Sequence, residues 1–185
     1  MAKKSGKPEA ALFPLPVVLV TCVDKAGKPN VITLAWAGIV CSEPPMLSVS
    51  IRPGRYSYGL IKEQKEFTVN IPTTAIMKET DICGTVSGRS GDKFKLAGLH
   101  TEPAKEVKAP LIKECPVALE CKVRDSKMLG THEMFIAEIV AVHVEESVLG
   151  PSGKMDCAKA GPFSYNWGEY WSLGKKVGHY GCSKG

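Results

Sequence analysis

Long apolar runs are missing from the sequence, and so is a convincing export signal. No stretch of about eighteen uninterrupted apolar residues occurs, which is the length that a membrane-spanning helix needs. Lysines precede the apolar stretch Leu12–Val23, but Pro14 and Pro16 interrupt it, and bulky Val20 lies where a signal peptide has a small residue. We therefore expect a cytoplasmic chain that does not cross a membrane.

Paired motifs for metals and disulfides are also missing. The seven cysteines form no C-x-x-C pair, and an odd number cannot be fully paired within one chain. The four histidines lie far from one another and from any paired cysteines. We expect free, buried thiols in a reducing compartment and no structural metal.

The common nucleotide-binding fingerprints are absent as well. The sequence has neither G-x-G-x-x-G after a strand nor G-x-x-x-x-G-K-[ST], so neither a dinucleotide fold nor a P-loop is indicated. The net charge is +5, but the 24 lysines and arginines are mixed with 19 acidic residues. This pattern argues against nucleic-acid binding and suits an anionic cofactor or a phosphate-bearing substrate.

What the sequence does contain is a series of short strands. The β-branched run Val17–Val23 predicts a strand followed by a turn. One strand is expected from Asn30 toward Cys41, where a pair of prolines soon ends the pattern. Met46–Ile51 predicts a half-buried strand, because its two serines alternate with apolar residues and therefore share one face.

Helices are expected between the later strands. The apolar spacing predicts a short helix in Tyr56–Glu66 and a second over 73–83, followed by the Gly- and Ser-rich loop Gly84–Gly91. Further strands are expected at Phe67–Ile71, Val117–Arg124 and Met134–Val144. Residues 95–116 show little period, and the tail from Gly150 is expected to be a loop with aromatic anchors at Phe163, Tyr165, Trp167, Tyr170 and Trp171.

These elements predict one domain that is mainly β. Residues 1–11 are charged and small and predict a mobile arm, whereas residues 12–185 predict a single globular domain. A hydrophobic fraction of 44% is enough for a core. Because strands and helices do not alternate strictly, an antiparallel barrel with inserted helices is favoured over a doubly wound parallel sheet.

Two guanidinium groups lie between a predicted strand and a predicted helix, in the segment Ser50–Ser57. A helix N-terminus offers unpaired N–H groups, and arginine forks match phosphate oxygens. Arg52 and Arg55 therefore indicate a phosphate site. In the alternative interpretation they are solvated loop residues, and Ser57 only caps its helix.

A second candidate segment is Ser87–Phe94, which is rich in glycine and serine. Its glycines let the backbone approach a ligand, and Lys93 supplies a point charge. An ordinary surface loop has the same composition, so taken alone this segment leaves both interpretations open.

A longer series of segments becomes specific when it is taken in order: Asn30, Thr33–Trp36, Cys41–Pro45, Ser48–Arg52, Arg55–Ser57, Glu66–Pro72, Ser87–Gly88, Asp92–Phe94 and His132–Val140. In combination these segments resemble the flavin reductase-like FMN-binding family, and most of all its flavoredoxin branch. The resemblance covers about residues 12–146, and the glycine-containing tail that ends at Tyr180-Gly181 also fits.

The resemblance implies a split β-barrel that forms a homodimer, with one FMN per subunit near the interface. It implies an isoalloxazine side lined by Thr33, Leu34, Ala35, Trp36 and Cys41, with ring contacts from Asn70 and Ile71. It implies that the ribityl chain and phosphate meet Ser50, Arg52, Arg55, Tyr56 and Ser57. It implies a closure over the cofactor by Ser87, Gly88 and Lys93.

Two of these positions carry an open question. Many members of the family have serine or another small hydroxyl residue at the position of Cys41, and cysteine is a poor donor, so a weaker flavin hydrogen bond is expected there. By the resemblance, His132 approaches the ring from the partner subunit. In the alternative it is an ordinary exposed loop histidine.

The activity implied by the resemblance is that of an NAD(P)H-dependent flavin reductase-like oxidoreductase. It would pass electrons from NADH or NADPH through FMN to free flavin, ferric chelates or a redox protein partner. No catalytic acid or base is named, because the flavin itself accepts the hydride. The alternative is a flavoredoxin-type FMN electron carrier without direct nicotinamide oxidation. A barrel that has lost its cofactor is disfavoured, because both arginines and Lys93 are retained.

Overall fold

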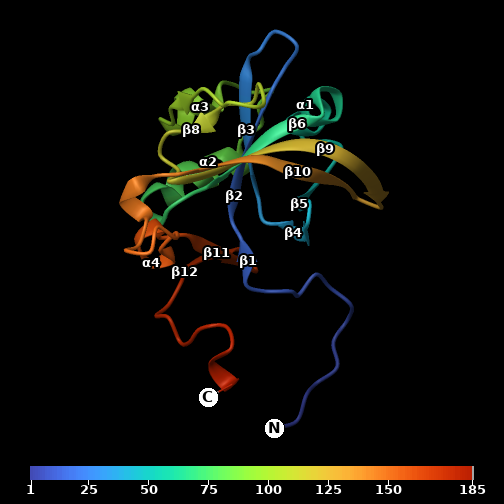
Figure 1. The fold of residues 1–185 in the computed structure, drawn as a ribbon. Helices are drawn as coiled ribbons and strands as arrows, with labels where there is room; N and C mark the ends of the chain where they lie inside the picture. The colour runs from blue at the N-terminus through green and yellow to red at the C-terminus, as the bar shows by residue number, and fades with distance from the viewer. Residues whose placement is uncertain (185) are drawn as a thin grey trace.

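A computed structural model describes residues 1–184 and is built around one antiparallel sheet of seven strands (Figure 1). The strands follow the order β3-β2-β6-β9-β10-β5-β4. Their bounds are β2 (Val18–Val23), β3 (Pro29–Leu34), β4 (Ala37–Ser42), β5 (Pro45–Ile51), β6 (Glu66–Ile71), β9 (Val117–Leu129) and β10 (His132–Val144). The prediction of a mainly β chain with antiparallel pairing is therefore confirmed.

The sheet curls so that its two ends share one core. Ile32 of β3 and Val49 of β5 come from opposite ends of the strand order, yet both belong to one buried cluster with Phe67 and Phe135. On β5 Leu47, Val49 and Ile51 are buried while Ser48 and Ser50 are only partly buried, which confirms the predicted alternation. Burial of this apolar set is the main favourable term for the fold.

The described residues form four helices, two of which cover the outer side of β2 and β3. The helices are α1 (Tyr56–Gln64), α2 (Met77–Thr85), α3 (Lys93–Ala97) and α4 (Cys157–Ala160), with single 3-10 turns at η1 (Thr74–Ile76), η2 (Glu146–Val148) and η3 (Cys182–Lys184). Side chains of α2 and α3 form a second core cluster with Leu19 and Val31. Strand β2 is consequently buried on both faces, which explains why its sequence is apolar almost throughout.

No described helix is long and apolar enough to span a membrane.

The prediction of one continuous strand from Asn30 toward Cys41 is wrong. The ladder of β3 with β2 ends at Leu34, and β4 starts at Ala37 and pairs with β5 instead. Ala35 and Trp36 connect the two strands and belong to neither ladder. Ala37 N donates to Ala35 O over 3.0 Å, and Ser50 N donates to Trp36 O over 2.9 Å. The residue pattern is typical of a strand both before and after Ala35-Trp36. The break between β3 and β4 is therefore visible only from the change of partner strand.

The prediction of an irregular tail is also wrong. Residues 163–172 form a hairpin of β11 (Phe163–Asn166) and β12 (Glu169–Ser172), and β1 (Leu15–Pro16) pairs with β11. The hairpin turn Trp167-Gly168 has positive φ at both residues, 48° and 88°, as a tight two-residue turn requires. The ring of Phe13 lies 5.3 Å from that of Trp167, and in Figure 1 both termini lie on this side.

The middle of the chain holds little regular structure beyond α3 and the short pair β7 (Thr101–Glu102) and β8 (Leu111–Ile112). The loop between β7 and β8 is held to the sheet by Glu120 of β9, whose side chain is fully buried. Its carboxylate accepts hydrogen bonds from the backbone N–H groups of Lys105 (2.9 Å), Glu106 (2.6 Å) and Val107 (3.0 Å). His143 Nε2 lies 2.6 Å from the same carboxylate.

These hydrogen bonds decide the charge of Glu120. Burial alone would raise the pKa of this carboxyl, but the backbone N–H groups and His143 stabilise the ionised form and lower the pKa below its usual value. Glu120 is therefore an anion that replaces its lost water by four protein partners, and the loop depends on it.

Residues 1–11 contain no helix or strand and are exposed. Their mobility stays a prediction.

Candidate functional site

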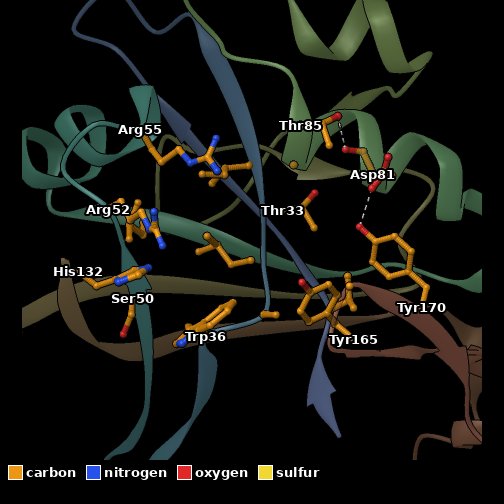
Figure 2. Close-up of a pocket in the computed structure, with 17 residues that line it drawn as sticks. Thr33, Trp36, Ser50, Arg52, Arg55, Asp81, Thr85, His132, Tyr165 and Tyr170 are labelled. Carbon is orange, nitrogen blue, oxygen red and sulfur yellow. Dashed lines mark hydrogen bonds between the residues drawn. The ribbon is translucent and has the colours of Figure 1, made fainter. Parts of the chain in front are cut away.

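Two adjoining cavities open beside strand β3. The larger one, here called the main cavity, has a volume of about 490 Å³, and the smaller one, the side pocket, about 230 Å³. Ile32, Arg55 and Gly84 line both, so the two cavities adjoin one another between β3, the end of β5 and α2. Figure 2 shows the main cavity with its arginines on one side and its tyrosines on the other.

The end of β3 and the end of β5 supply the first wall of the main cavity. Its lining residues from these elements are Thr33, Leu34, Ala35, Trp36, Ser50, Ile51 and Arg52. The ring of Trp36 stacks against that of His132 with centroids 6.0 Å apart and planes at 17°. Burial and the neighbouring Arg52 guanidinium lower the pKa of His132, which favours its neutral form.

The opposite wall comes from α2 and the C-terminal hairpin (Figure 2). Tyr170 Oη donates to Asp81 Oδ1 over 2.9 Å, and this bond ties β12 to α2. Burial, followed by the Asp81 carboxylate, raises the pKa of Tyr170 to about 12, so the phenol stays protonated and remains a donor. Tyr165, opposite Tyr170 in the hairpin, completes this wall.

The side pocket has a more polar lining than the main cavity and contains a buried cationic side chain. Ser57, on the first turn of α1, is buried, and its Oγ accepts a hydrogen bond from Asn30 Nδ2 over 2.7 Å. Lys93, at the start of α3, is only 4% exposed, and its Nζ donates to the carbonyl of Cys83 over 2.7 Å. Burial, with a contribution from Arg55, lowers the pKa of Lys93 to about 8.

The start of α1 adds donors to the same pocket. No side chain caps this helix, and Tyr58 N donates to Arg55 O over 3.1 Å, so the N–H groups of Tyr56 and Ser57 are left without a partner within the helix. The alternative in which Ser57 caps its helix is therefore wrong, since Ser57 lies within the helix and its hydroxyl bonds Asn30. Unpaired N–H groups and the positive end of the helix dipole both favour an anion here.

Three cationic side chains face this space without an acidic partner. Within residues 1–184, none of the ion pairs involves Arg52, Arg55 or Lys93. Lys93 is buried, and a buried charge is costly unless a counter-ion can occupy the site, whereas Arg52 and Arg55 are exposed at its edge. The cavity therefore has the charge pattern of a site for an anionic ligand.

The loop after α2 forms one side of the side pocket and packs closely against Tyr56 and Asn30. A Cβ atom at Gly88 would lie 2.5 Å from Tyr56 Cδ1 and closer still to Asn30 Oδ1. Only glycine permits this approach, which brings the backbone of the loop against Tyr56 and the start of α1. Glycine is thus needed here because the loop packs closely against its neighbours, and not because a turn requires a positive φ.

The structure brings together most of the residues that the sequence indicates. The main cavity is lined by Thr33, Leu34, Ala35, Trp36, Ser50, Arg52, Arg55 and His132, and the side pocket by Arg55, Tyr56, Ser57, Ser87, Gly88 and Lys93. Their roles toward a cofactor stay predictions, as does the homodimer.

Three indicated residues do not line either cavity. Cys41 lies on β4, where its Sγ contacts the carbonyl of Glu43 at 3.4 Å. Asn70 is fully buried and joins two segments, because its Nδ2 donates to Leu19 O (3.2 Å) and its Oδ1 accepts from Ile112 N (2.9 Å). Ile71 packs against a small third core cluster.

Among the lining residues that the sequence analysis did not name as site residues, four have polar or aromatic side chains. Asp81 lies on the helix that was expected over 73–83, whereas Thr85 was expected in the loop Gly84–Gly91 and is in fact the last residue of α2. Nothing in the local pattern distinguishes a lining side chain from a solvated one at these positions. Tyr165 and Tyr170 were noted as aromatic anchors of the tail, and that aromatic content was the available signal.

The fold and this cavity define a flavin reductase-like split barrel. The sequence matches the model of the flavin reductase-like domain over residues 10–172, and the chain belongs to this family. The predicted fold class, an antiparallel split β-barrel with inserted helices, is confirmed.

Two solved structures are similar over nearly their whole length. Flavoredoxin of Desulfovibrio vulgaris (Miyazaki F) has a TM-score of 0.93 and 35% identity, covering 100% of both chains. Flavoredoxin from Methanosarcina acetivorans has a TM-score of 0.90 and 34% identity, covering 98% of this chain and 97% of the other. An uncharacterized protein of Archaeoglobus fulgidus is 38% identical over 145 residues, which is 78% of this chain and 80% of the relative. The family and these likenesses support a flavin-binding redox function.

Proposed function

We propose that the chain binds FMN, with the phosphate in the side pocket and the isoalloxazine in the main cavity, and acts as an oxidoreductase. The observation that carries this proposal is that Arg55 and Lys93 line the side pocket and Arg52 lines the adjoining aromatic-lined main cavity, all three without acidic partners.

The residues of the side pocket fit a phosphate monoester. Arg55 offers a planar fork, Lys93 a point charge and the uncapped start of α1 its N–H groups, which together match several phosphate oxygens. The main cavity, at about 490 Å³, is in the usual size range of a cofactor site and has both apolar and polar lining. The donor set and the space therefore fit FMN.

Bound FMN would supply hydride acceptance at its N5 atom, and the tasks of the chain are orientation and shielding. The backbone between Leu34 and Trp36 turns away from the sheet along the first wall and can hold the edge of a flat ring. The tyrosine wall, fixed by the Tyr170–Asp81 hydrogen bond, excludes water from the other side. No side chain needs to act as a general base.

NADH or NADPH is the proposed electron donor, and free flavin, a ferric chelate or a redox protein the proposed acceptor. Family membership supports this flavin reductase activity. A second candidate is an FMN electron carrier that does not oxidise nicotinamide itself. It is favoured by the two relatives named flavoredoxin, each about one-third identical to this chain.

The test begins with the visible spectrum of the purified protein after incubation with FMN and removal of the excess. Oxidised-flavin bands that bleach rapidly when NADH or NADPH is added without oxygen are the expected result. Bands that persist with both nucleotides but bleach with a reduced protein partner would assign the carrier function. A protein that retains no flavin would overturn the proposal.

The substitution Gly88→Ala is expected to weaken FMN binding by about tenfold, because the new Cβ forces the loop away from Tyr56 and Asn30 and opens the side pocket. The measurement is a titration of FMN fluorescence against the apoprotein. Gly91→Ala is the matched control, since its Cβ would only meet Leu96 Cδ1 at an ordinary 3.5 Å. Equal affinities for the two variants would contradict the prediction.

A further inference from the structure

Arg89 lies in the loop that closes the side pocket but does not line the pocket itself. Its neighbours Ser87 and Gly88 do line it, whereas the Arg89 side chain reaches back across the pocket rim. There its Nη1 donates to the carbonyl of Gly54 over 2.9 Å. Its guanidinium also lies over the ring of Tyr56, 5.8 Å from the centroid.

These two contacts join segments that are far apart in the sequence. Gly54, Arg55, Tyr56 and Ser57 form one rim of the side pocket, and the loop after α2 forms the other. Gly54 and Tyr56 flank Arg55, so both points that Arg89 touches are next to the cation that faces the pocket. Arg89 therefore bridges the two rims from outside.

The loop is folded in a way that directs Arg89 toward this bridge. Ser90 N donates to Ser87 O over 3.0 Å, and Arg89 N donates to Ser87 Oγ over 3.2 Å, which together make a compact turn. This turn keeps Gly88 against Tyr56 on the pocket side and Arg89 on the outer side. A guanidinium can serve such a bridge well, because it hydrogen-bonds in its plane and stacks with its face.

We propose that Arg89 is a positioning residue that fastens the loop over the side pocket and thereby sets how long a phosphate-bearing cofactor stays bound. The inference rests on the proposed binding of FMN. Arg89 acts through Ser87 and Gly88, which it holds in place, and through the segment around Arg55. It has no direct contact with the pocket interior.

The test compares release of FMN with release of riboflavin, which has the same ring and ribityl chain but no phosphate. In Arg89→Ala, FMN dissociation measured by stopped-flow fluorescence is expected to be about tenfold faster than in the wild type, a change of about 1.4 kcal/mol. Riboflavin dissociation is expected to be unchanged. Arg89→Lys should recover part of the FMN effect, because lysine keeps the charge but not the planar fork.

Arg124→Ala is the matched control, since Arg124 is an exposed arginine that pairs with Glu138 on the sheet. It should leave both rates unchanged. Unchanged FMN release in Arg89→Ala, or equal acceleration for both ligands, would overturn the role of Arg89 while FMN binding by the wild type stands. A wild type that binds neither ligand would instead overturn the proposed function.

Discussion

Replacing Glu120 by alanine is expected to lower the free energy of unfolding by about 3 kcal/mol or more. The substitution leaves the part-buried N–H groups of Lys105 and Glu106 and the buried N–H group of Val107 without their acceptor, and His143 without its partner. Each unsatisfied buried group is costly, so the loop between β7 and β8 should detach from the sheet. Chemical denaturation of the apoprotein measures the effect.

The matched control is Glu138→Ala, because Glu138 also lies on the sheet but pairs with Arg124 in a half-exposed position. An ion pair of this kind contributes less than about 1 kcal/mol. If the two alanine variants lose equal stability, Glu120 does not have the role described above.

The acid dependence of stability gives a second readout of Glu120. Its pKa in the folded protein is lowered below the usual value for an unfolded chain, which is about 4.3. The stabilisation is therefore present above that pH and is lost as the pH falls toward the lowered pKa. The drop in stability below about pH 4.3 should be shallower in Glu120→Gln than in the wild type.

The affinity for FMN is expected to fall above about pH 8 by as much as tenfold per pH unit. Burial lowers the pKa of Lys93 to about 8, and only the charged form attracts a phosphate dianion. A bound phosphate would raise this pKa, so binding takes up a proton once the free protein has lost it. Below about pH 6 the phosphate itself begins to lose one charge, which places the highest affinity between these limits.

The variant Lys93→Met separates this effect from other titrations. It keeps a long apolar side chain in the buried position but removes the charge, and it should weaken FMN binding by about a hundredfold near pH 7, in line with a charge-assisted contact. The decline above pH 8 should vanish, and riboflavin affinity should change little. A Lys93→Met curve that keeps the wild-type pH profile would assign the titration to another group.

The sequence predicts the elements whose signal is local. Strand β5 follows from the alternation around Ser48 and Ser50, and α1 begins at Tyr56, where its apolar spacing starts. The break after Leu34 does not follow, because it depends on which strand each segment pairs with. The hairpin at 163–172 is missed because its strands have four residues each, too few for a period to be recognised.

For the candidate site, the cationic segments were visible in the sequence but their convergence was not. Arg55 and Lys93 are separated by a helix, a strand and a second helix, and only the fold places both on the side pocket. Asn70 shows the opposite case. The resemblance implies a contact with the flavin ring. In the structure, the nitrogen and the oxygen of its side-chain amide instead form hydrogen bonds with the backbone of Leu19 and Ile112. Local sequence cannot distinguish a buried amide that joins segments from one that faces a ligand.

The hairpin that carries Tyr165 and Tyr170 follows every other lining residue in the chain. During synthesis from the N-terminus, both arginines and Lys93 leave the ribosome long before this wall does. A nascent chain therefore exposes the cationic part of the site before any enclosure is available. Closure must wait until β11 has emerged and paired with β1, which is made before every other strand of the described chain. Stable enclosure of a ligand is thus a late step in the synthesis of this domain.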